Sequence, residues 1–173
     1  MADASRYSAT ETLRDGRSVQ IRALKPEDRT AMANAVERVS AQSLYRRFFA
    51  ARRSFSEKET DFFVNVDFLN HVALVAVVNE GGAAVIIGGG RYVLVQPGTA
   101  EVAFAVVDQY QGQGVGAALM RHLATIARDA GIEQFVAEVL PENAPMLKLF
   151  EKCGCRMSTK RDGQVVHVTL GLN

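Results

Sequence analysis

Runs of apolar residues at strand spacing recur along most of this chain. "SVQIRAL" alternates apolar and polar residues, which is typical of a half-buried strand. "HVALVAVV", "AAVIIGGGRYVLV" and "AEVAFAVV" are apolar runs separated by short glycine or proline turns, which predicts an antiparallel meander. The segments that fit strands are 18–24, 71–78, 83–95, 100–107, 134–140, 155–158 and 165–172. A central sheet of about seven strands is therefore expected.

Helical patterns fill the segments between these strands. Pro26 suits a first helical turn, Ser56 and Glu59 have capping-box spacing, and Asn143 can cap a further helix. The expected helices cover 25–40, 43–50, 56–66, about 114–130 and 143–154. Residues 1–17 are mostly small or polar and are expected to form a flexible N-terminal arm. Residues 18–173 then form a single α/β domain.

The segment "QYQGQGVGAALM", residues 109–120, carries the clearest chemical signal. A glycine-rich loop that opens a helix can bind phosphate through backbone N–H groups and the helix dipole. Gly112, Gly114 and Ala117 fit a dinucleotide fingerprint, and Glu138 stands where an acid could hold a ribose. However, that fingerprint starts directly at the end of a strand, and further βα units follow it. Here four residues intervene and a meander precedes the loop, which disfavours the dinucleotide interpretation.

Gln111-Gly112-Gln113-Gly114-Val115-Gly116 instead resembles the acyl-CoA motif of the GNAT acetyltransferases. The predicted order of strands and helices is also that of the GNAT fold, from about residue 18 to the end. "SVQIRALKPED", "SLYRRFF" and "AEVLPENAPMLKLFEKCG" resemble the catalytic domain of bacterial Pat-type protein lysine acetyltransferases. The resemblance implies an acyl-CoA N-acyltransferase fold with a mixed central sheet flanked by helices.

The resemblance further implies that acetyl-CoA is the cosubstrate. Its pyrophosphate is expected on the glycine loop, where the absence of Cβ atoms lets backbone amides approach the phosphates. The pantetheine arm is expected along the strand before the loop, with an N–H near Val106 polarising the thioester carbonyl. The expected acetyl-CoA-binding residues are Ala105, Val106, Val107, Gln111, Gly112, Gln113, Gly114, Val115, Gly116, Ala117 and Asn143.

Acetyl transfer to an amine requires a neutral nucleophile, so a base must accept a proton. Glu101 is the candidate, because it interrupts an apolar strand, where an unpaired buried carboxylate is costly. In the family that this chain resembles, the glutamate of "AEVAF" activates the acceptor lysine. A salt bridge or a solvated edge carboxylate is the structural alternative. Many GNAT enzymes use a tyrosine as acid at the position of Phe150, and this chain departs from that pattern.

Composition removes several other classes of function. The formal net charge is +1 and no apolar run is long enough to span a bilayer, so neither nucleic acid nor a membrane is an expected partner. Cys153 and Cys155 form no second pair, the three histidines are scattered, and no metal site is expected. The first residues lack the apolar stretch of a signal peptide, which favours a cytoplasmic protein.

The acceptor cannot be derived from the residues alone. The Pat-type resemblance implies a lysine of a folded protein, such as the active-site lysine of an AMP-forming acyl-CoA synthetase. Arg46 and Arg47, in "YRRFFAARR", could then contact an acidic acceptor. Two alternatives stay open: an acetyltransferase for small amines, and an acetyl-CoA-binding regulatory module without catalysis. The sequence does not indicate an oligomeric state.

Overall fold

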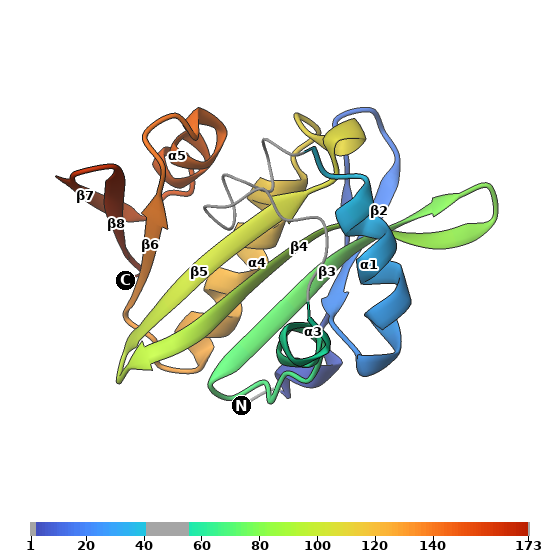
Figure 1. The fold of residues 1–173 in the computed structure, drawn as a ribbon, viewed down its shortest axis with the longest axis horizontal. Helices are drawn as coiled ribbons and strands as arrows, with labels where there is room; N and C mark the ends of the chain where they lie inside the picture. The colour runs from blue at the N-terminus through green and yellow to red at the C-terminus, as the bar shows by residue number, and fades with distance from the viewer. Residues whose placement is uncertain (1–2, 41–55, 173) are drawn as a thin grey trace.

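A twisted sheet with helices on both faces forms the protein (Figure 1). The structure, a computed structural model, describes residues 3–40 and 56–172. The helix expected over 43–50 lies outside this range, as do Arg46 and Arg47. The strands are β1 Ser8–Thr12, β2 Ser18–Ala23, β3 His71–Glu80, β4 Ala83–Gln96, β5 Thr99–Val106, β6 Gln134–Val139, β7 Arg156–Asp162 and β8 Val165–Gly171. The α-helices in that range are α1 Arg29–Glu37, α3 Glu57–Val64, α4 Val115–Asp129 and α5 Ala144–Glu151. Short 3₁₀ turns are η1 Ala4–Arg6, η2 Pro26–Asp28 and η3 Asp108–Tyr110.

The sheet has the strand order β1-β2-β3-β4-β5-β6-β8-β7. Its neighbours pair antiparallel, except that β5 and β6 pair parallel. This mixed sheet confirms the expected α+β GNAT architecture, with eight strands rather than about seven. The parallel pairing covers only Thr99–Glu101 against Gln134–Val136. Beyond it β5 and β6 diverge, and α5 lies above the end of β6 (Figure 1).

The additional strand is β1, which lies in the expected flexible arm. Its residues pair with β2 from Ser8 to Thr12 and form one edge of the sheet. The arm is also anchored to α4, because Glu11 contacts His122 at 2.7 Å and Tyr7 hydrogen-bonds the same imidazole. The structure thus places a strand within the segment that the sequence suggested to be a flexible arm. Five mostly polar residues give little apolar alternation, which is why the pattern did not reveal the strand.

Helices on both sides of the sheet account for the apolar runs. Figure 1 shows α4 behind the sheet and α1 with α3 in front of it. β3 is buried from His71 to Val78 because both of its faces are covered. Leu119 and Leu123 of α4 are fully buried. Gly90 leaves room for Leu123 and Phe104, since a Cβ there would lie 3.1 Å from Leu123 Cδ1 and 2.7 Å from Phe104 Cδ1.

Local signals fix the helix ends largely as expected. Ser56 Oγ accepts a hydrogen bond from the Glu59 N–H at 3.1 Å, and the Glu59 side chain accepts from the Ser56 N–H at 3.0 Å. The segment expected as one helix over 25–40 consists of a 3₁₀ turn at Pro26–Asp28 followed by α1. Gly131, in the left-handed region, follows the end of α4.

Candidate functional site

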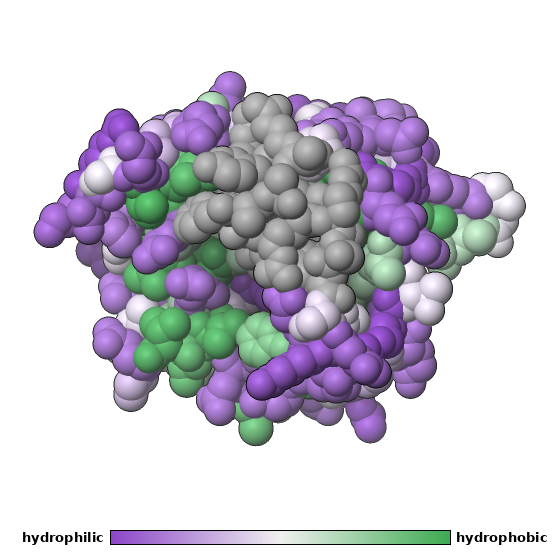
Figure 2. Space-filling view, viewed as in Figure 1, coloured by the Kyte–Doolittle hydropathy of each residue, from purple (hydrophilic) through white to green (hydrophobic). Residues whose placement is uncertain are grey.

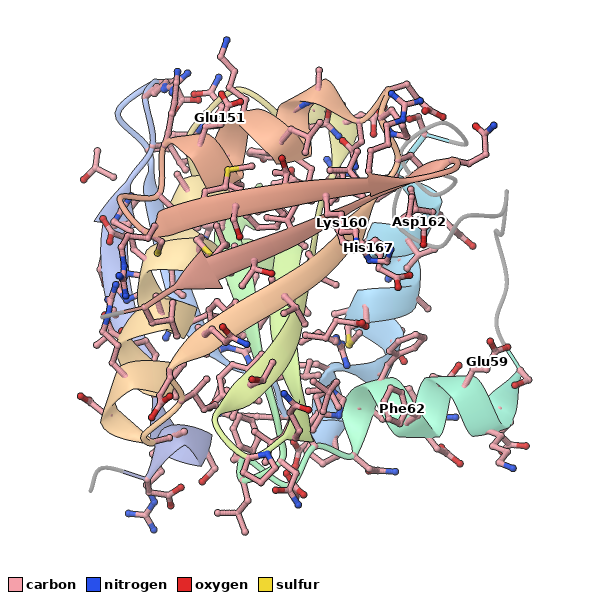
Figure 3. All side chains as sticks on the ribbon, turned by 90° about the vertical axis from the view of Figure 1, so that its left-hand side faces the viewer. Glu59, Phe62, Glu151, Lys160, Asp162 and His167 are labelled. Atoms are coloured by element: carbon pink, nitrogen blue, oxygen red, sulfur yellow. The ribbon has the colours of Figure 1, made fainter. Side chains whose placement is uncertain are left out.

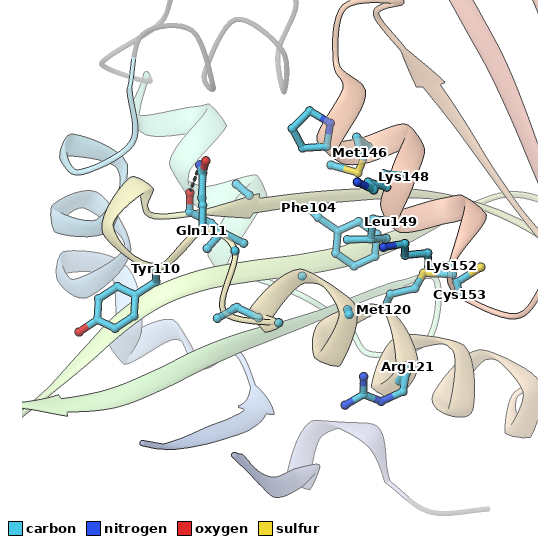
Figure 4. Close-up of a pocket in the computed structure, with 18 of the residues that line it drawn as sticks. Phe104, Tyr110, Gln111, Met120, Arg121, Met146, Lys148, Leu149, Lys152 and Cys153 are labelled. Carbon is cyan, nitrogen blue, oxygen red and sulfur yellow. Dashed lines mark hydrogen bonds between the residues drawn. The ribbon is translucent and has the colours of Figure 1, made fainter. Parts of the chain in front are cut away.

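A cavity of about 420 Å³ lies between α4, α5 and the end of β5 (Figure 4). We call it the glycine-loop cavity. Most of the residues expected to bind acetyl-CoA line it: Ala105, Val106, Gln111, Gly112, Gly114, Val115, Gly116, Ala117 and Asn143. The fold thus brings the loop after β5 together with the start of α5, about thirty residues further along the chain.

Two of the expected residues lie elsewhere. Val107 lines a second cavity, because it is on the opposite face of β5 from Phe104 and Val106. The side chain of Gln113 turns away from the glycine-loop cavity, and its Oε1 accepts a hydrogen bond from the Asp15 N–H at 3.2 Å. Any contact of Gln113 with a ligand would therefore use its backbone.

The glycine loop has a backbone suited to anions. Gly112 and Gly114 adopt φ of +80° and +94°, a conformation that disfavours side chains. Gly114 is the N-cap of α4, and no side chain caps the helix. The amides of the first turn of α4 therefore carry the positive end of the helix dipole, and within residues 3–40 and 56–172 they have no protein acceptor. Gly112, Gly114 and the residues up to Ala117 line the cavity, as an anion cradle requires.

Gly116 serves a different purpose from the other two glycines. A Cβ at this position would lie 2.8 Å from Leu149 Cδ1 of α5. The glycine thus permits a close approach of α4 and α5 where they form the cavity wall. By contrast, a Cβ at Gly112 or Gly114 would meet nothing within 4 Å.

The edge of β5 that faces β6 is available for backbone pairing. The Val107 N–H donates to the Ile87 carbonyl of β4 at 2.8 Å. Successive residues of a strand point their N–H groups to opposite sides, so the Val106 N–H faces the gap between β5 and β6. The Val106 carbonyl accepts a hydrogen bond from Gln111 Nε2 at 3.0 Å. This side chain thus ties the glycine loop to the end of β5.

The charge of the glycine-loop cavity favours a polyanion. Its described lining holds four cationic side chains, those of Arg14, Arg121, Lys148 and Lys152, and no carboxylate. Lys148 lies on α5 and Lys152 is the C-cap of this helix, one turn further along, and both are exposed. Arg121 forms an ion pair with Glu11 at 3.1 Å. The amide cradle and these cations together fit the phosphates of an acyl-CoA.

Helix α5 closes the far wall of this cavity. Asn143 is buried and its side chain caps α5, accepting a hydrogen bond from the Met146 N–H at 3.3 Å. Phe150 is fully buried against Phe104, with their ring centroids 6.3 Å apart. Cys153 also lines the cavity, and its thiol donates to the Phe150 carbonyl at 3.0 Å. Both cysteines are free thiols, and burial raises the pKa of Cys155 to about 11.

A second cavity of about 380 Å³ lies on the opposite face of β5, between the sheet and helices α1 and α3. We call it the helix α1 cavity. Ala103 and Ala105 of β5 line it, as does Val107, the residue directly after β5. Its described walls are mainly apolar, with Arg29, Glu37, Thr60 and Arg91 as the polar side chains. Ala105 and Val39 line both cavities, so the two approach each other at the end of β5.

Glu101 lies on the face of the helix α1 cavity but lines neither cavity. Alternation along β5 places it on the same side as Ala103 and Ala105. Its side chain is exposed, although the apolar sequence around it suggested burial. Glu101 is exposed because of its position in the sheet. It pairs with Val93 and Val136, and this part of the sheet lies beyond the area that α1 covers.

A hydrogen-bond network around the buried Tyr110, which the sequence did not reveal, supports the glycine loop. The Tyr110 hydroxyl donates to Glu80 at 2.5 Å and accepts from Arg17 at 3.1 Å. Arg38, at the end of α1, makes two hydrogen bonds of 3.1 Å to the Glu80 carboxylate. The hydrogen bonds from Arg38 and Tyr110 lower the pKa of Glu80. Three distant segments thus fix Tyr110 just before Gln111.

His71 and Arg91 form a second polar pair, beside the helix α1 cavity. His71 is buried, and its Nε2 lies 3.0 Å from Arg91 Nη1. Burial, and then the charge of Arg91, lowers the pKa of His71 to about 4. The imidazole is therefore neutral at pH 7 and accepts the arginine N–H. Arg91 also donates to the Phe63 carbonyl at 3.1 Å, which fixes the guanidinium at the cavity wall.

The profile of the Acetyltransferase (GNAT) family matches residues 34–155. The chain belongs to the GNAT acetyltransferase family. It is 34% identical over 162 residues to "Acetyltransferase PA5475" of Pseudomonas aeruginosa, covering 91% of this chain and 86% of that protein. It is 33% identical over 144 residues to "Acetyltransferase Pat" of Mycolicibacterium smegmatis, covering 82% of this chain but 42% of Pat.

Among solved structures, the GNAT domain of S. lividans PAT superposes with a TM-score of 0.86 at 36% identity. That match covers 95% of this chain and 96% of the PAT domain. The chain is thus an acetyl-CoA-dependent GNAT acetyltransferase related to the Pat enzymes. In the part that the structure describes, no helix is both long and apolar enough to cross a membrane. Over the same residues, no cluster of three His, Cys, Asp or Glu side chains could hold a metal ion.

Proposed function

We propose that this GNAT enzyme transfers the acetyl group of acetyl-CoA to a lysine side chain of a folded protein. The observation that carries the proposal is the pair of cavities on opposite faces of β5, which share Ala105. A donor in one cavity and an acceptor in the other can then meet at the end of β5. Direct attack in a ternary complex requires this arrangement.

The glycine-loop cavity is the proposed site of acetyl-CoA. Residues 112–117 and the cationic side chains bind the phosphates, and the β5 edge pairs with the pantetheine arm. The bound thioester supplies the acetyl group and a thiolate leaving group. The Val106 N–H is proposed to donate to the acetyl carbonyl, and removing one such donor typically costs roughly 3 kcal/mol of transition-state stabilisation. No hydroxyl is available at Phe150 to protonate the thiolate, whose usual pKa of about 8.5 makes its departure inexpensive.

The helix α1 cavity is the proposed channel for the acceptor lysine. Its apolar walls suit the methylene stem of a lysine, and Ala103 and Ala105 leave space beside β5. Figure 2 shows hydrophobic surface gathered on the left of this face, over β5 and β6, within a mainly hydrophilic surrounding. A protein acceptor could bury that surface when it docks.

Polar side chains from four strands, β5 to β8, lie on the same face beside the gap between β5 and β6. The register pairs Glu101 with Val136, and Glu138, two residues along β6, pairs with His167 of β8. The Glu138 carboxylate lies 3.7 Å from His167 Nδ1, and Asp162 lies 3.7 Å from Nε2. Figure 3 shows His167, Lys160 and Asp162 together on the β7–β8 hairpin. These side chains are proposed to contact the acceptor surface around its lysine.

Glu101 is proposed to accept the proton of the lysine ammonium, by way of water. The strand rise places its Cα roughly 13 Å from that of Ala105. That distance exceeds the reach of one glutamate side chain, so direct proton transfer at Ala105 is not possible. The exposed carboxylate is well placed to exchange protons with solvent.

Measuring acetyl-CoA consumption over a panel of acceptors tests this proposal. The panel should contain an intact AMP-forming acyl-CoA synthetase, free lysine and spermidine. The intact synthetase should give the highest kcat/KM, since contacts remote from the lysine add binding energy. A higher kcat/KM for spermidine or lysine would replace this proposal with a small-molecule acetyltransferase. Binding of acetyl-CoA without turnover of any amine would favour a regulatory module.

A further inference from the structure

The turn between β1 and β2 docks directly onto the glycine loop, although the two are 98 residues apart in the chain. The Arg14 N–H donates to the Gln113 carbonyl at 3.2 Å. Its guanidinium Nη1 donates to the Gly112 carbonyl at 2.9 Å. The Asp15 N–H donates to the Gln113 side chain at 3.2 Å. Three hydrogen bonds from two residues therefore hold the loop.

These bonds fix the direction of the loop amides. In a planar trans peptide the C=O and the following N–H point to opposite sides. Because the carbonyls of Gly112 and Gln113 point to the β1–β2 turn, the N–H groups of Gln113 and Gly114 point away from it. Gly112 and Gly114, on either side of Gln113, are both left-handed, and left-handed residues in such turns are typical of the concave amide arrangements that bind anions.

The Arg14 side chain also brings charge to the same place. Its guanidinium lines the glycine-loop cavity and is exposed. Within residues 3–40 and 56–172, the bond to Gly112 is the hydrogen bond that this guanidinium makes, so its other N–H groups can bind a ligand. The neighbouring Asp15 carboxylate is paired with Arg17 at 2.7 Å and does not neutralise Arg14.

We infer that Arg14 is a positioning and phosphate-binding residue, which holds the glycine loop open and binds the diphosphate of acetyl-CoA. The inference rests on the proposed use of the glycine-loop cavity for acetyl-CoA. It gives a function at the cofactor to a segment whose sequence suggested a flexible arm. This role of Arg14 involves the diphosphate and not the acetyl transfer step.

The test is the affinity of the full-length Arg14→Ala variant for three ligands. Acetyl-CoA and 3′-dephospho-acetyl-CoA are titrated by calorimetry, and S-acetylpantetheine, which lacks the diphosphate, by ligand-observed NMR. The dissociation constants of the first two should rise by the same factor, roughly tenfold to a hundredfold, as expected for charge-assisted hydrogen bonds. The dissociation constant of S-acetylpantetheine should stay within twofold of the wild-type value.

Two further variants separate this role from general damage to the protein. Arg14→Lys retains the positive charge and should recover part of the lost affinity. Arg6→Ala is the matched control, because Arg6 is an exposed arginine of the same N-terminal segment, with 88% of its side chain accessible. It should bind all three ligands like the wild type. Thermal denaturation checks that each variant is folded.

The possible results distinguish this inference from the proposed function. If wild-type protein binds acetyl-CoA and the dissociation constant of Arg14→Ala is within twofold of the wild-type value, the inference is overturned and the proposed function stands. An equal loss of affinity for S-acetylpantetheine also overturns it, because the effect would not involve the diphosphate. If Arg14→Ala does not fold, the Arg14→Lys variant decides: acetyl-CoA binding as tight as that of the wild type overturns the inference. Wild-type protein that does not bind acetyl-CoA overturns both.

Discussion

Replacing His71 by glutamine should remove the contribution of this histidine to the pH dependence of stability between about pH 6.5 and pH 4. The folded protein lowers the pKa of His71 from 6.5 to about 4, chiefly through burial. In this range the unfolded chain binds a proton at His71 and the folded chain does not. Stability rises with pH wherever the unfolded state binds more protons, so the wild type loses stability as the pH falls through this range.

The magnitude follows from the difference between the two pKa values. Each unit of difference between the unfolded and folded pKa corresponds to about 1.4 kcal/mol. Because the folded protein keeps His71 neutral, the wild type should lose roughly 3 kcal/mol of unfolding free energy between pH 7 and pH 4. Glutamine does not titrate, and its amide oxygen can accept the hydrogen bond that Arg91 makes to His71. The charged neighbours Arg91 and Asp67 are the same in both proteins.

Urea denaturation of both proteins at pH 4, 5, 6 and 7 measures this difference. From pH 7 to pH 4, the wild type should lose roughly 3 kcal/mol more unfolding free energy than His71→Gln. His167→Gln is the matched control for replacing one histidine by glutamine, because 41% of the His167 side chain is accessible and it lies on β8, away from Arg91. Parallel pH profiles for His71→Gln and wild type would refute the reasoning.

Three predictions concern the proposed chemistry. Glu101→Gln should lower kcat roughly 10²–10⁴-fold without changing acetyl-CoA affinity, with a smaller loss at high pH; full turnover at pH 7 would remove Glu101 from the mechanism. Gly116→Ala should lower both thermal stability and acetyl-CoA affinity, because its Cβ would lie 2.8 Å from Leu149 Cδ1. Adding Leu149→Ala should restore part of both. An unchanged acetyl-CoA affinity of Gly116→Ala in calorimetry would contradict this. Replacing both Lys148 and Lys152 by alanine should weaken acetyl-CoA binding roughly three- to tenfold, because both cations line the glycine-loop cavity; unchanged affinity in calorimetry would contradict their contact with the phosphates.

The sequence predicted the elements that depend on local chemistry. The glycine loop, the capping box at Ser56 and the cap at Asn143 are short motifs whose residues determine their own backbone. The order of strands then predicted that the loop and the start of α5 would meet. Their lining of one cavity follows from that order, since β5 and β6 are neighbours and each precedes one wall of the cavity.

Features that depend on distant contacts could not be predicted. The docking of Arg14 onto Gly112 joins residues 98 positions apart, and nothing in the local pattern around Arg14 indicates it. Glu101 was expected to be buried because its neighbours are apolar, but its exposure depends on where α1 ends above the sheet. The same limit applies to Tyr110, whose partners come from β3 and the β1–β2 turn.

The most direct test of the central claim compares kcat/KM for two forms of one acceptor lysine. One form is an intact, folded AMP-forming acyl-CoA synthetase, and the other is a short peptide that copies the sequence around its active-site lysine. If the lysine enters the helix α1 cavity while the surrounding surface docks on the gap between β5 and β6, the intact protein should have the higher kcat/KM by at least tenfold. Equal values, or a peptide that reacts faster, would contradict a folded protein as the acceptor.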